Sequence, residues 1–211
     1  MYLSRLLLDP LCRQVQRELT EPYEMHRTLM RAFEGPRDRA RVLFRVDVSR
    51  RTGIPSLLVQ SQGEPSWGFL DQVRGYLLQP SPDGLPNPAQ KQRDLQLAAG
   101  QTLAFRLHAN PTFKREGKRL AWLQEEDQLN WLQRKGEQGG FRLLQALAAP
   151  LGMTAGRKRD ERGDQRLSWF VVRFEGVLQV TDPVVCRQAL ESGIGASKSL
   201  GCGLLSFAPA R

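Results

Sequence analysis

Hydrophobic positions at the start of the chain change their period near Asp9. Residues 2–8 form a short apolar run that Asp9 and Pro10 end, which is typical of a strand buried mostly on both faces. Residues 11–19 carry apolar side chains at helical spacing, and Pro22 stands at the first position of a second predicted helix. The core face of this second helix is expected to be Met25, Leu29 and Phe33.

Residues 40–109 are expected to hold three strands and one helix. Residues 42–48 alternate Val42, Phe44, Val46 and Val48 with Leu43, Arg45 and Asp47, and residues 55–61 have an apolar centre. The turn Arg51-Thr52-Gly53 between them predicts a hairpin. Residues 67–78 favour a helix, and the prolines and glycine of residues 80–88 require a loop. Residues 102–108 alternate again, which predicts a strand that closes this first unit.

The second half of the chain shows a similar order of elements. A helical segment around Trp122, Leu129 and Leu132 is expected to end at Gly139-Gly140, and residues from Phe141 onward favour strand. Residues 167–180 carry a strong β pattern, Asp182-Pro183 begins a helix that extends to about Glu191, and residues 204–207 form a last strand.

These elements predict an α+β fold. The order β-α-β-β-α-β is that of the ferredoxin-like, or RRM-like, unit with an antiparallel sheet. We therefore expect two such domains in tandem, the first over residues 1–109 and the second over residues 120–211, with the polar and basic residues 110–119 as the linker.

The charge of the chain indicates a polyanionic partner. Lys and Arg outnumber Asp and Glu by 31 to 22, which gives a net charge of +9. The excess is rich in Arg, whose planar fork matches phosphates and base edges, so nucleic acid is the expected partner. Three widely spaced cysteines and an N-terminal apolar run that ends at Asp9 predict a reduced cytoplasmic protein that is not bound to a membrane.

A glycine-rich segment near the C-terminus is a candidate phosphate-binding loop. Residues 193–203 contain two Gly-x-Gly clusters around Ser197-Lys198-Ser199. Glycine allows positive φ and close approach of the backbone to a ligand, so the loop can direct N–H groups at a phosphate while Lys198 adds charge. The alternative is a flexible turn. The candidate contacts are Gly193, Gly195, Ser197, Lys198, Gly201 and Gly203.

The second predicted helix carries candidate catalytic side chains. Tyr23 and His26 lie three residues apart and therefore on one helical face, and Arg27 and Arg31 are close by. Metal-free RNA cleavage needs proton transfer at the 2′-OH and at the leaving 5′-oxygen, together with positive charge on the transition state. A lone histidine beside a core stripe is otherwise often structural, and His108 at a strand end is taken as structural.

A basic turn between two predicted strands is a candidate RNA-binding element. Residues 156–166 carry Arg157, Lys158, Arg159 and Arg162, and such a hairpin suits the backbone and groove of folded RNA. A solvated hairpin tip is the alternative. No metal or cofactor is expected, because neither Asp47 nor the Glu125-Glu126-Asp127 cluster has carboxylate partners at the spacing of a two-metal nuclease.

Two of these motifs together resemble a known family. Residues 193–203 match the Gly-hydrophobic-Gly, five residues, Gly-hydrophobic-Gly signature of the repeat-processing CRISPR endoribonucleases. The run Pro22-Tyr23-Glu24-Met25-His26-Arg27, on the first helices after an N-terminal strand, is similar to that of the type I-E group of the family. The resemblance extends over nearly the whole chain, including residues 141–144, 174–178 and 203–206.

The resemblance implies a function and roles for individual residues. It implies two ferredoxin-like domains that bind a CRISPR repeat stem-loop and cleave precursor crRNA at the 3′ base of the hairpin by 2′-OH attack. The ends would be a 2′,3′-cyclic phosphate and a 5′-hydroxyl, and the protein would keep the guide within a Cascade complex with other subunits. From their positions in the family's motifs, His26 would be the general acid or base and Tyr23 its partner in orienting the attack. The turn around Lys158 would bind the stem and help to position the scissile phosphate. Arg31 stands where the family leads us to expect a lysine, and an arginine keeps the charge but does not readily donate a proton.

Two other functions compete with this one. A non-catalytic RNA-binding protein with tandem RRM-like domains would leave His26 packed or in contact with a phosphate, but residues 42–48 and 102–108 lack the paired aromatics that stack bases. A purely structural subunit of an effector complex would assemble on mature guide RNA without cleaving it.

Overall fold

The computed structural model describes residues 1–34, 40–160 and 163–210, and the side chains of residues 157–160 and 164–166 lie outside that description. The chain forms two compact units. The first consists of Met1–Asp94, Gly156–Leu167 and Ser199–Gly201, and the second of Leu95–Ala155, Ser168–Lys198 and Cys202–Arg211. Each unit contains a four-stranded sheet.

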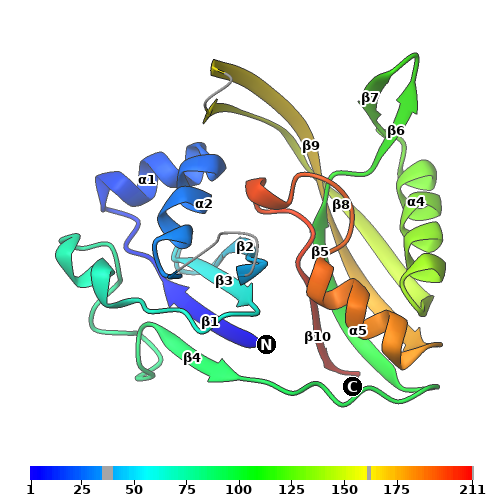
Figure 1. Cartoon of the computed structure of the whole chain (residues 1–211), viewed down its shortest axis with the longest axis horizontal. Coiled ribbons are helices and arrows are strands. Elements are labelled where there is room, and N and C mark those ends of the chain that lie inside the picture. Colours follow the sequence, from blue (N-terminus) through cyan, green and yellow to red (C-terminus); the bar gives the residue numbers. More distant parts are fainter. Residues whose placement is uncertain (35–39, 161–162, 211) are drawn as a thin grey trace. The chain divides into compact units, whose positions relative to one another are not determined.

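The first sheet has the order β2-β3-β1-β4, so the first strand lies at the centre (Figure 1). Its strands are β1 (Tyr2–Leu7), β2 (Leu43–Val48), β3 (Pro55–Ser61) and β4 (Ala89–Gln92). All the pairings are antiparallel. Leu57 of β3 lies between Leu6 of β1 on one side and Val46 of β2 on the other. Between β1 and β2 lie α1 (Arg13–Thr20) and α2 (Pro22–Met30).

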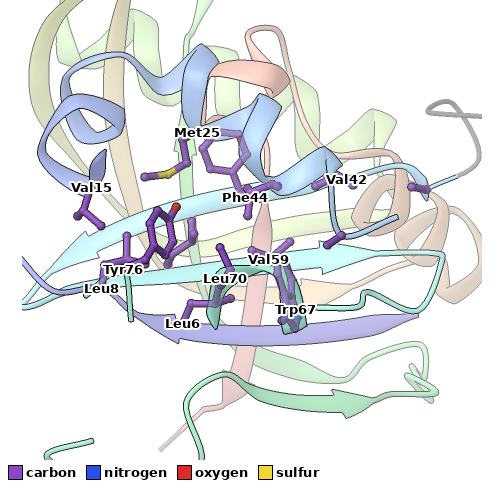
Figure 2. Packing of buried hydrophobic residues seen from close by; sticks show 14 residues of the cluster. Leu6, Leu8, Val15, Met25, Val42, Phe44, Val59, Trp67, Leu70 and Tyr76 are labelled. Atoms are coloured by element: carbon purple, nitrogen blue, oxygen red, sulfur yellow. The ribbon is translucent and has the colours of Figure 1, made fainter. Parts of the chain in front are cut away.

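The helices α1 and α2 cover one face of this sheet through an apolar core. Val15 from α1 and Met25 and Leu29 from α2 are buried against Leu6, Leu8, Phe44, Leu57 and Val59 (Figure 2). The predicted core positions Met25 and Leu29 are confirmed, and Phe33 packs against the same core as a partly buried side chain. Burial of one such side chain contributes about 1.5–3 kcal/mol, so packing rather than intrinsic propensity holds these two short helices.

The second sheet has the order β10-β5-β9-β8. Its strands are β5 (Thr102–Ala109), β8 (Phe141–Asp160), β9 (Gly163–Val180) and β10 (Leu205–Pro209), and its helices are α4 (Glu125–Gln138) and α5 (Pro183–Ser192). Trp131 and Leu132 of α4 and Cys186 of α5 are buried against strand residues such as Phe105, Val172 and Phe174. Both sheets place the first strand of their unit between the third and the fourth, so the predicted tandem ferredoxin-like fold is confirmed.

Asp182 shows why α5 begins where the sequence predicted. Its carboxylate accepts hydrogen bonds from the backbone N–H groups of Val184 (2.9 Å) and Val185 (3.0 Å), and Pro183 occupies the first helical position. Side-chain capping of this kind satisfies donors that the first turn of a helix leaves unpaired.

Three expectations about single elements were wrong. Residues 102–108 do not close the first unit, because β5 pairs with β9 and β10 of the second sheet. Residues 110–119 are not a plain linker, since they include β6 (Thr112–Arg115) and the start of β7 (Lys118–Ala121), which pair with each other. Between these strands Glu116 (φ 51) and Gly117 (φ 76) form a two-residue turn with both residues at positive φ, which suits a tight hairpin.

The third difference lies in the first unit. Within residues 67–78 only Gly68–Gln72 forms a helix, the 3-10 turn η1, because Val73 is extended and Gly75 has a φ of 72. The predicted hairpin of β2 and β3 is confirmed. Burial along β2 does not follow the alternation, since Leu43 and Arg45 are 3% and 4% exposed whereas Val48 is 57% exposed. The Arg45 side chain is ion-paired with Asp47 at 2.8 Å.

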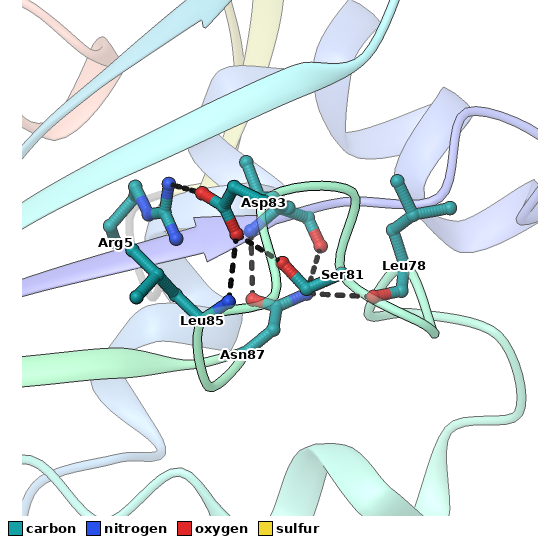
Figure 3. A network of polar contacts seen from close by, with 7 residues as sticks. Arg5, Leu78, Ser81, Asp83, Leu85 and Asn87 are labelled. Carbon is teal, nitrogen blue, oxygen red and sulfur yellow. Dashed lines mark hydrogen bonds and ion pairs between the residues drawn. The ribbon is translucent and has the colours of Figure 1, made fainter.

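The loop after η1 is fixed to β1 by side chains (Figure 3). The Asn87 amide bonds to the backbone of β1 as a neighbouring strand would. Its Oδ1 accepts from the Leu7 N–H at 2.9 Å, and its Nδ2 donates to the carbonyls of Leu7 and Leu78 at 2.8 and 3.0 Å. Asp83 pairs with Arg5 of β1, and hydrogen bonds from Arg5, Ser81 and the Leu85 N–H lower the pKa of the Asp83 carboxyl well below its usual range. The predicted loop over residues 80–88 is therefore confirmed as an ordered one.

The three cysteines are free thiols, as expected. Burial raises the pKa of Cys186 to about 11, with a further contribution from Asp182, and burial raises the pKa of Cys202 to about 12. None of the helices in the described ranges has the length and apolar composition needed to cross a membrane.

Gly176 is the position of closest approach between β9 and β8. A Cβ atom at this residue would lie 2.0 Å from the carbonyl oxygen of Gln145, which belongs to the backbone and has no rotamer to change. We expect Gly176→Ala to lower the free energy of unfolding by about 1–3 kcal/mol or more, as overpacking does. Gly68→Ala is the matched control, since nothing lies within 4 Å of a Cβ there. Denaturant unfolding measures both, and equal stabilities for the two variants would contradict the predicted clash.

Candidate active site

The helix α2 presents Tyr23 and His26 on one face, as the sequence predicted. Pro22 occupies its first position and fixes where the helix begins, and both side chains are half-buried. The ring centroids of Tyr23 and His26 are 6.2 Å apart, and the His26 ring is stacked on Phe44 of β2, also at 6.2 Å with an interplanar angle of 16°. The imidazole therefore lies nearly parallel to the ring of the buried Phe44, and Tyr23 lies beside it on the same helix.

The two arginines of this region are oriented by neighbouring side chains. Arg27 forms an ion pair with Glu24 at 3.2 Å, and the Arg17 guanidinium of α1 lies 3.7 Å from the same carboxylate. The guanidinium of Arg31 lies 4.5 Å above the ring of Phe69, a cation–π arrangement that holds its planar head. Arg27 and Arg31 remain exposed, so both are available to an anionic ligand.

Phe44, Phe69 and Glu24 are the side chains around this site that the sequence analysis did not assign to it. Phe44 was expected only as one residue of an alternating strand. No local signal connects residues 44 and 69 with residues 26 and 31, because stacking partners so far apart in the chain are determined by the fold.

The glycine-rich segment closes on itself. The Ile194 N–H donates to the Gly203 carbonyl at 2.9 Å, the Gly203 N–H to the His108 carbonyl at 2.7 Å and the Cys202 N–H to the Ser197 carbonyl at 3.3 Å. The Nδ2 of Asn110 donates to the Ser197 hydroxyl at 3.0 Å, and the Lys198 ammonium donates to the Ser192 carbonyl at the end of α5 at 2.6 Å. These bonds give the segment a defined shape.

Glycine is needed for that shape at two positions. Gly195 has a φ of 82 and a Cβ there would lie 3.0 Å from the Trp131 ring, and Gly203 has a φ of 91 and a Cβ there would lie 3.0 Å from the Ile194 carbonyl oxygen. Gly193 and Gly201 also have positive φ, as does Ser197. Specific hydrogen bonds and close contacts thus define the conformation of this segment, which favours a built loop over a flexible turn. Contact of these residues with a phosphate stays a prediction.

The basic turn falls largely outside the described side chains. Arg157, Lys158 and Arg159 belong to β8, but their side chains are not described, and Arg162 lies outside the described residues. Their role stays a prediction.

A second basic surface lies on the hairpin β6–β7, which was expected to be a linker. Lys114, Arg115, Lys118 and Arg119 are exposed on it, and the rings of Phe113 and Trp122 at its base are 4.1 Å apart. A pocket of ≈ 320 Å³ beside it is lined by three cations, Lys114, Arg119 and Lys135, and by the backbone at Gly195 and Ala196. We call Lys114, Arg115, Lys118 and Arg119 the basic ribbon. The sequence signal for it is the pair of basic dipeptides, Lys114-Arg115 and Lys118-Arg119, on either side of Glu116-Gly117.

No group of three or more His, Cys, Asp or Glu side chains suited to a metal ion occurs among residues 1–34, 40–160 and 163–210 where side chains are described.

Comparison with known proteins identifies the family. Residues 1–209 match the family model described as CRISPR associated protein. The chain belongs to this family. It is 38% identical to the CRISPR-associated endoribonuclease Cse3 of Thermus thermophilus over 99% of this chain and 100% of the relative. It is 31% identical to the Cascade subunit CasE of Escherichia coli K12, again over 99% of this chain and 100% of the relative.

A solved structure of the same family gives the same fold. The structure of CRISPR endoribonuclease Cse3 bound to a 19-nucleotide RNA matches with a TM-score of 0.85 at 38% identity, over 99% of this chain and 100% of that chain. The resemblance to type I-E CRISPR endoribonucleases, which the motifs at residues 22–27 and 193–203 indicated, is thereby confirmed for this CRISPR-associated protein.

Proposed function

We propose that this chain is an endoribonuclease that binds CRISPR repeat stem-loops and cleaves precursor crRNA at the 3′ base of the hairpin. The Tyr23–His26 pair on α2, in a chain that matches the family from residue 1 to residue 209, is the observation that carries the proposal. Its Thermus relative is an endoribonuclease and its E. coli relative is a Cascade subunit. The protein would act in the cytoplasm and remain bound to its guide within a Cascade-type complex.

In this mechanism the 2′-oxygen of the nucleotide before the cut attacks the adjacent phosphorus. The 2′-hydroxyl loses its proton, the bond from phosphorus to the 5′-oxygen breaks, and that oxygen gains a proton. The products are a 2′,3′-cyclic phosphate and a 5′-hydroxyl. His26 exchanges one of these protons as general acid or base, and Tyr23 orients the attack. Exposed arginines near them, Arg27 and Arg31, supply positive charge for the phosphorane-like transition state.

The remaining cations would hold the RNA. The basic turn with Arg157, Lys158, Arg159 and Arg162 and the basic ribbon are both suited to stem phosphates, and Gly193, Gly195, Ser197, Lys198, Gly201 and Gly203 would line the RNA path at the glycine-rich segment. Lys158 is the candidate for a contact with the scissile phosphate.

The test is cleavage of a labelled repeat hairpin by purified protein in excess EDTA. We expect cleavage to persist and the products to carry a 2′,3′-cyclic phosphate and a 5′-hydroxyl, because no step of the proposed reaction uses a metal ion. A non-catalytic RNA-binding subunit would bind the hairpin and leave it intact. Loss of cleavage in EDTA with recovery on adding Mg²⁺ would contradict the mechanism.

Removing the charges of the basic turn is expected to weaken stem-loop binding and to flatten its salt dependence. Each phosphate that the protein no longer neutralises reduces the slope of log K against log salt by about 0.7–0.9, since fewer counterions are released. The quadruple Ala variant of Arg157, Lys158, Arg159 and Arg162 should therefore lose far more affinity for a stem-loop than for an unstructured strand of equal length. Filter binding at several salt concentrations measures both.

A matched quadruple Ala variant of the basic ribbon separates the two surfaces, because it removes the same charge elsewhere. Should only the ribbon variant change the slope, the turn is a solvated hairpin tip. Slower cleavage by Lys158→Ala at saturating RNA would indicate that Lys158 acts at the scissile phosphate, because a residue that only binds the stem does not affect the rate at saturation.

A further inference from the structure

A buried carboxylate, Glu18, lies beneath the helix that carries the candidate catalytic pair. Glu18 belongs to α1, is 3% exposed and lies among apolar side chains of the first core. It accepts hydrogen bonds from the hydroxyls of Thr28 and Tyr76, both at 2.6 Å, and from Nε2 of Gln14 at 2.8 Å. Three donors supply what a buried carboxylate requires, so the cluster is a satisfied polar network within an apolar core.

Tyr76 is a permanent donor in this network. Its side chain lies near Val15 of α1 and Met25 of α2 (Figure 2) and is 1% exposed. Burial first, and then the neighbouring Glu18 carboxylate, raise the pKa of Tyr76 far above its usual range. The phenol therefore stays protonated at neutral pH, where its hydroxyl can donate to Glu18.

Thr28 connects the network to α2. It is 8% exposed and lies on the core face of the helix between Met25 and Leu29, two residues beyond His26. The packing of Met25 and Leu29 is not directional, so it permits small rotations and shifts of a nine-residue helix. A hydrogen bond is directional, and α2 has no side-chain hydrogen bond at its N-cap residue Glu21. The ion pair between Arg17 of α1 and Glu24 of α2 is 3.7 Å long and partly exposed, so it restricts the helix less. The Thr28–Glu18 bond is therefore a buried, directional contact that restricts the rotation and the axial position of α2.

We propose that Glu18, Thr28 and Tyr76 are positioning residues for RNA cleavage, which set α2 so that Tyr23 and His26 meet the scissile phosphodiester in the reactive geometry. The inference rests on the proposed function. All three side chains are buried, so they act through α2 and not on the RNA. A displacement of about 1 Å at a reacting group can cost on the order of 10²-fold in rate, so a small shift of α2 has a measurable effect.

The experiment compares Thr28→Val with Thr28→Ser. Valine keeps the shape of threonine and removes the hydroxyl, whereas serine keeps the hydroxyl. With the protein saturating, we expect Thr28→Val to lower the single-turnover cleavage rate about 10- to 100-fold and Thr28→Ser to remain within about 3-fold of the original chain. The affinity for a 2′-deoxy stem-loop, which is bound but not cut, should not change.

Tyr76→Phe removes the second hydroxyl that donates to the Glu18 carboxylate. It should slow cleavage as well, and the double variant with Thr28→Val should lose less than the product of the two single effects, because both act through Glu18. Leu6→Ala, a buried position of the same core on β1, which β3 separates from the strand that carries Phe44, is the stability control. All rates are measured at a temperature at which circular dichroism shows each variant to be folded.

A second readout does not depend on cleavage. The chain has two histidines, so the ring signals of His26 are assigned in ¹H–¹³C spectra with the His26→Ala variant alone. We expect Thr28→Val, but neither Thr28→Ser nor Leu6→Ala, to shift the His26 ring signals. Rates and signals in Thr28→Val equal to those in Thr28→Ser would overturn the positioning role and leave the network as a stabilising one.

The two proposals fail in different ways. If the original chain binds the stem-loop without cutting it, the proposed function fails, and the His26 signals still decide whether the network positions α2. If the original chain cuts the stem-loop and Thr28→Val cuts it equally fast, only the positioning role fails.

Discussion

Replacing the 2′-hydroxyl before the scissile bond by hydrogen is expected to abolish cleavage. In the proposed mechanism this hydroxyl is the nucleophile, so the deoxy substrate has no group that can form the cyclic phosphate, whatever the state of His26 and Tyr23. The loss should be complete within the detection limit of a single-turnover assay. Binding should survive, because one hydroxyl among the many groups of a stem-loop that the protein binds contributes about 1 kcal/mol.

The position of the deoxy residue provides the control. The same substitution one nucleotide to the 3′ side removes an equivalent hydroxyl that is not the nucleophile. Cleavage of this control substrate at the original scissile bond should continue. A hydrolytic nuclease with a water nucleophile would cut both substrates, and that result would refute the transesterification mechanism.

His26→Ala is expected to lower the single-turnover rate by about 10²- to 10⁴-fold, the usual contribution of a general acid or base. The affinity for the stem-loop should change little, because the His26 ring is held by Phe44 and flanked by Tyr23 and is half-buried. Single-turnover kinetics with saturating protein separate the rate from the affinity.

Tyr23→Phe is the comparison for this variant. It removes one hydroxyl and keeps the ring beside His26, so a role limited to orientation predicts a smaller loss, about 10-fold, as expected for one hydrogen bond. Near-normal cleavage by His26→Ala would return His26 to a structural role, and the proton transfers would have to be assigned to other groups.

Local chemistry explains why the sequence predicted the start of α2 and the common face of Tyr23 and His26. Pro22 can begin a helix but not continue one, and helical spacing then places Tyr23 and His26 on one face and Met25 and Leu29 in the core. Asp182 and Pro183 gave the start of α5 in the same way. The order of strands and helices in each half was sufficient for the ferredoxin-like fold, because few arrangements bury such a pattern.

The hydrophobic pattern of a single segment does not show which strands pair with each other. Alternation in residues 102–108 shows that they form a strand, but not which strand lies beside them, and Arg106 pairs across to Glu175 of β9 rather than within the first sheet. The buried Arg45 of β2 illustrates the same limit, since an arginine in an alternating strand predicts an exposed face.

The sequence by itself determined the family, the fold class and the two side chains proposed for catalysis, because proline positions, helical spacing and glycine spacing are properties of short segments. Only the tertiary structure decided that Phe44 stacks on His26, that the glycine-rich segment closes through the His108 carbonyl, and that Glu18 holds Thr28 and Tyr76 beneath α2. These interactions join residues that are distant in the chain, and they depend on packing that no single segment specifies.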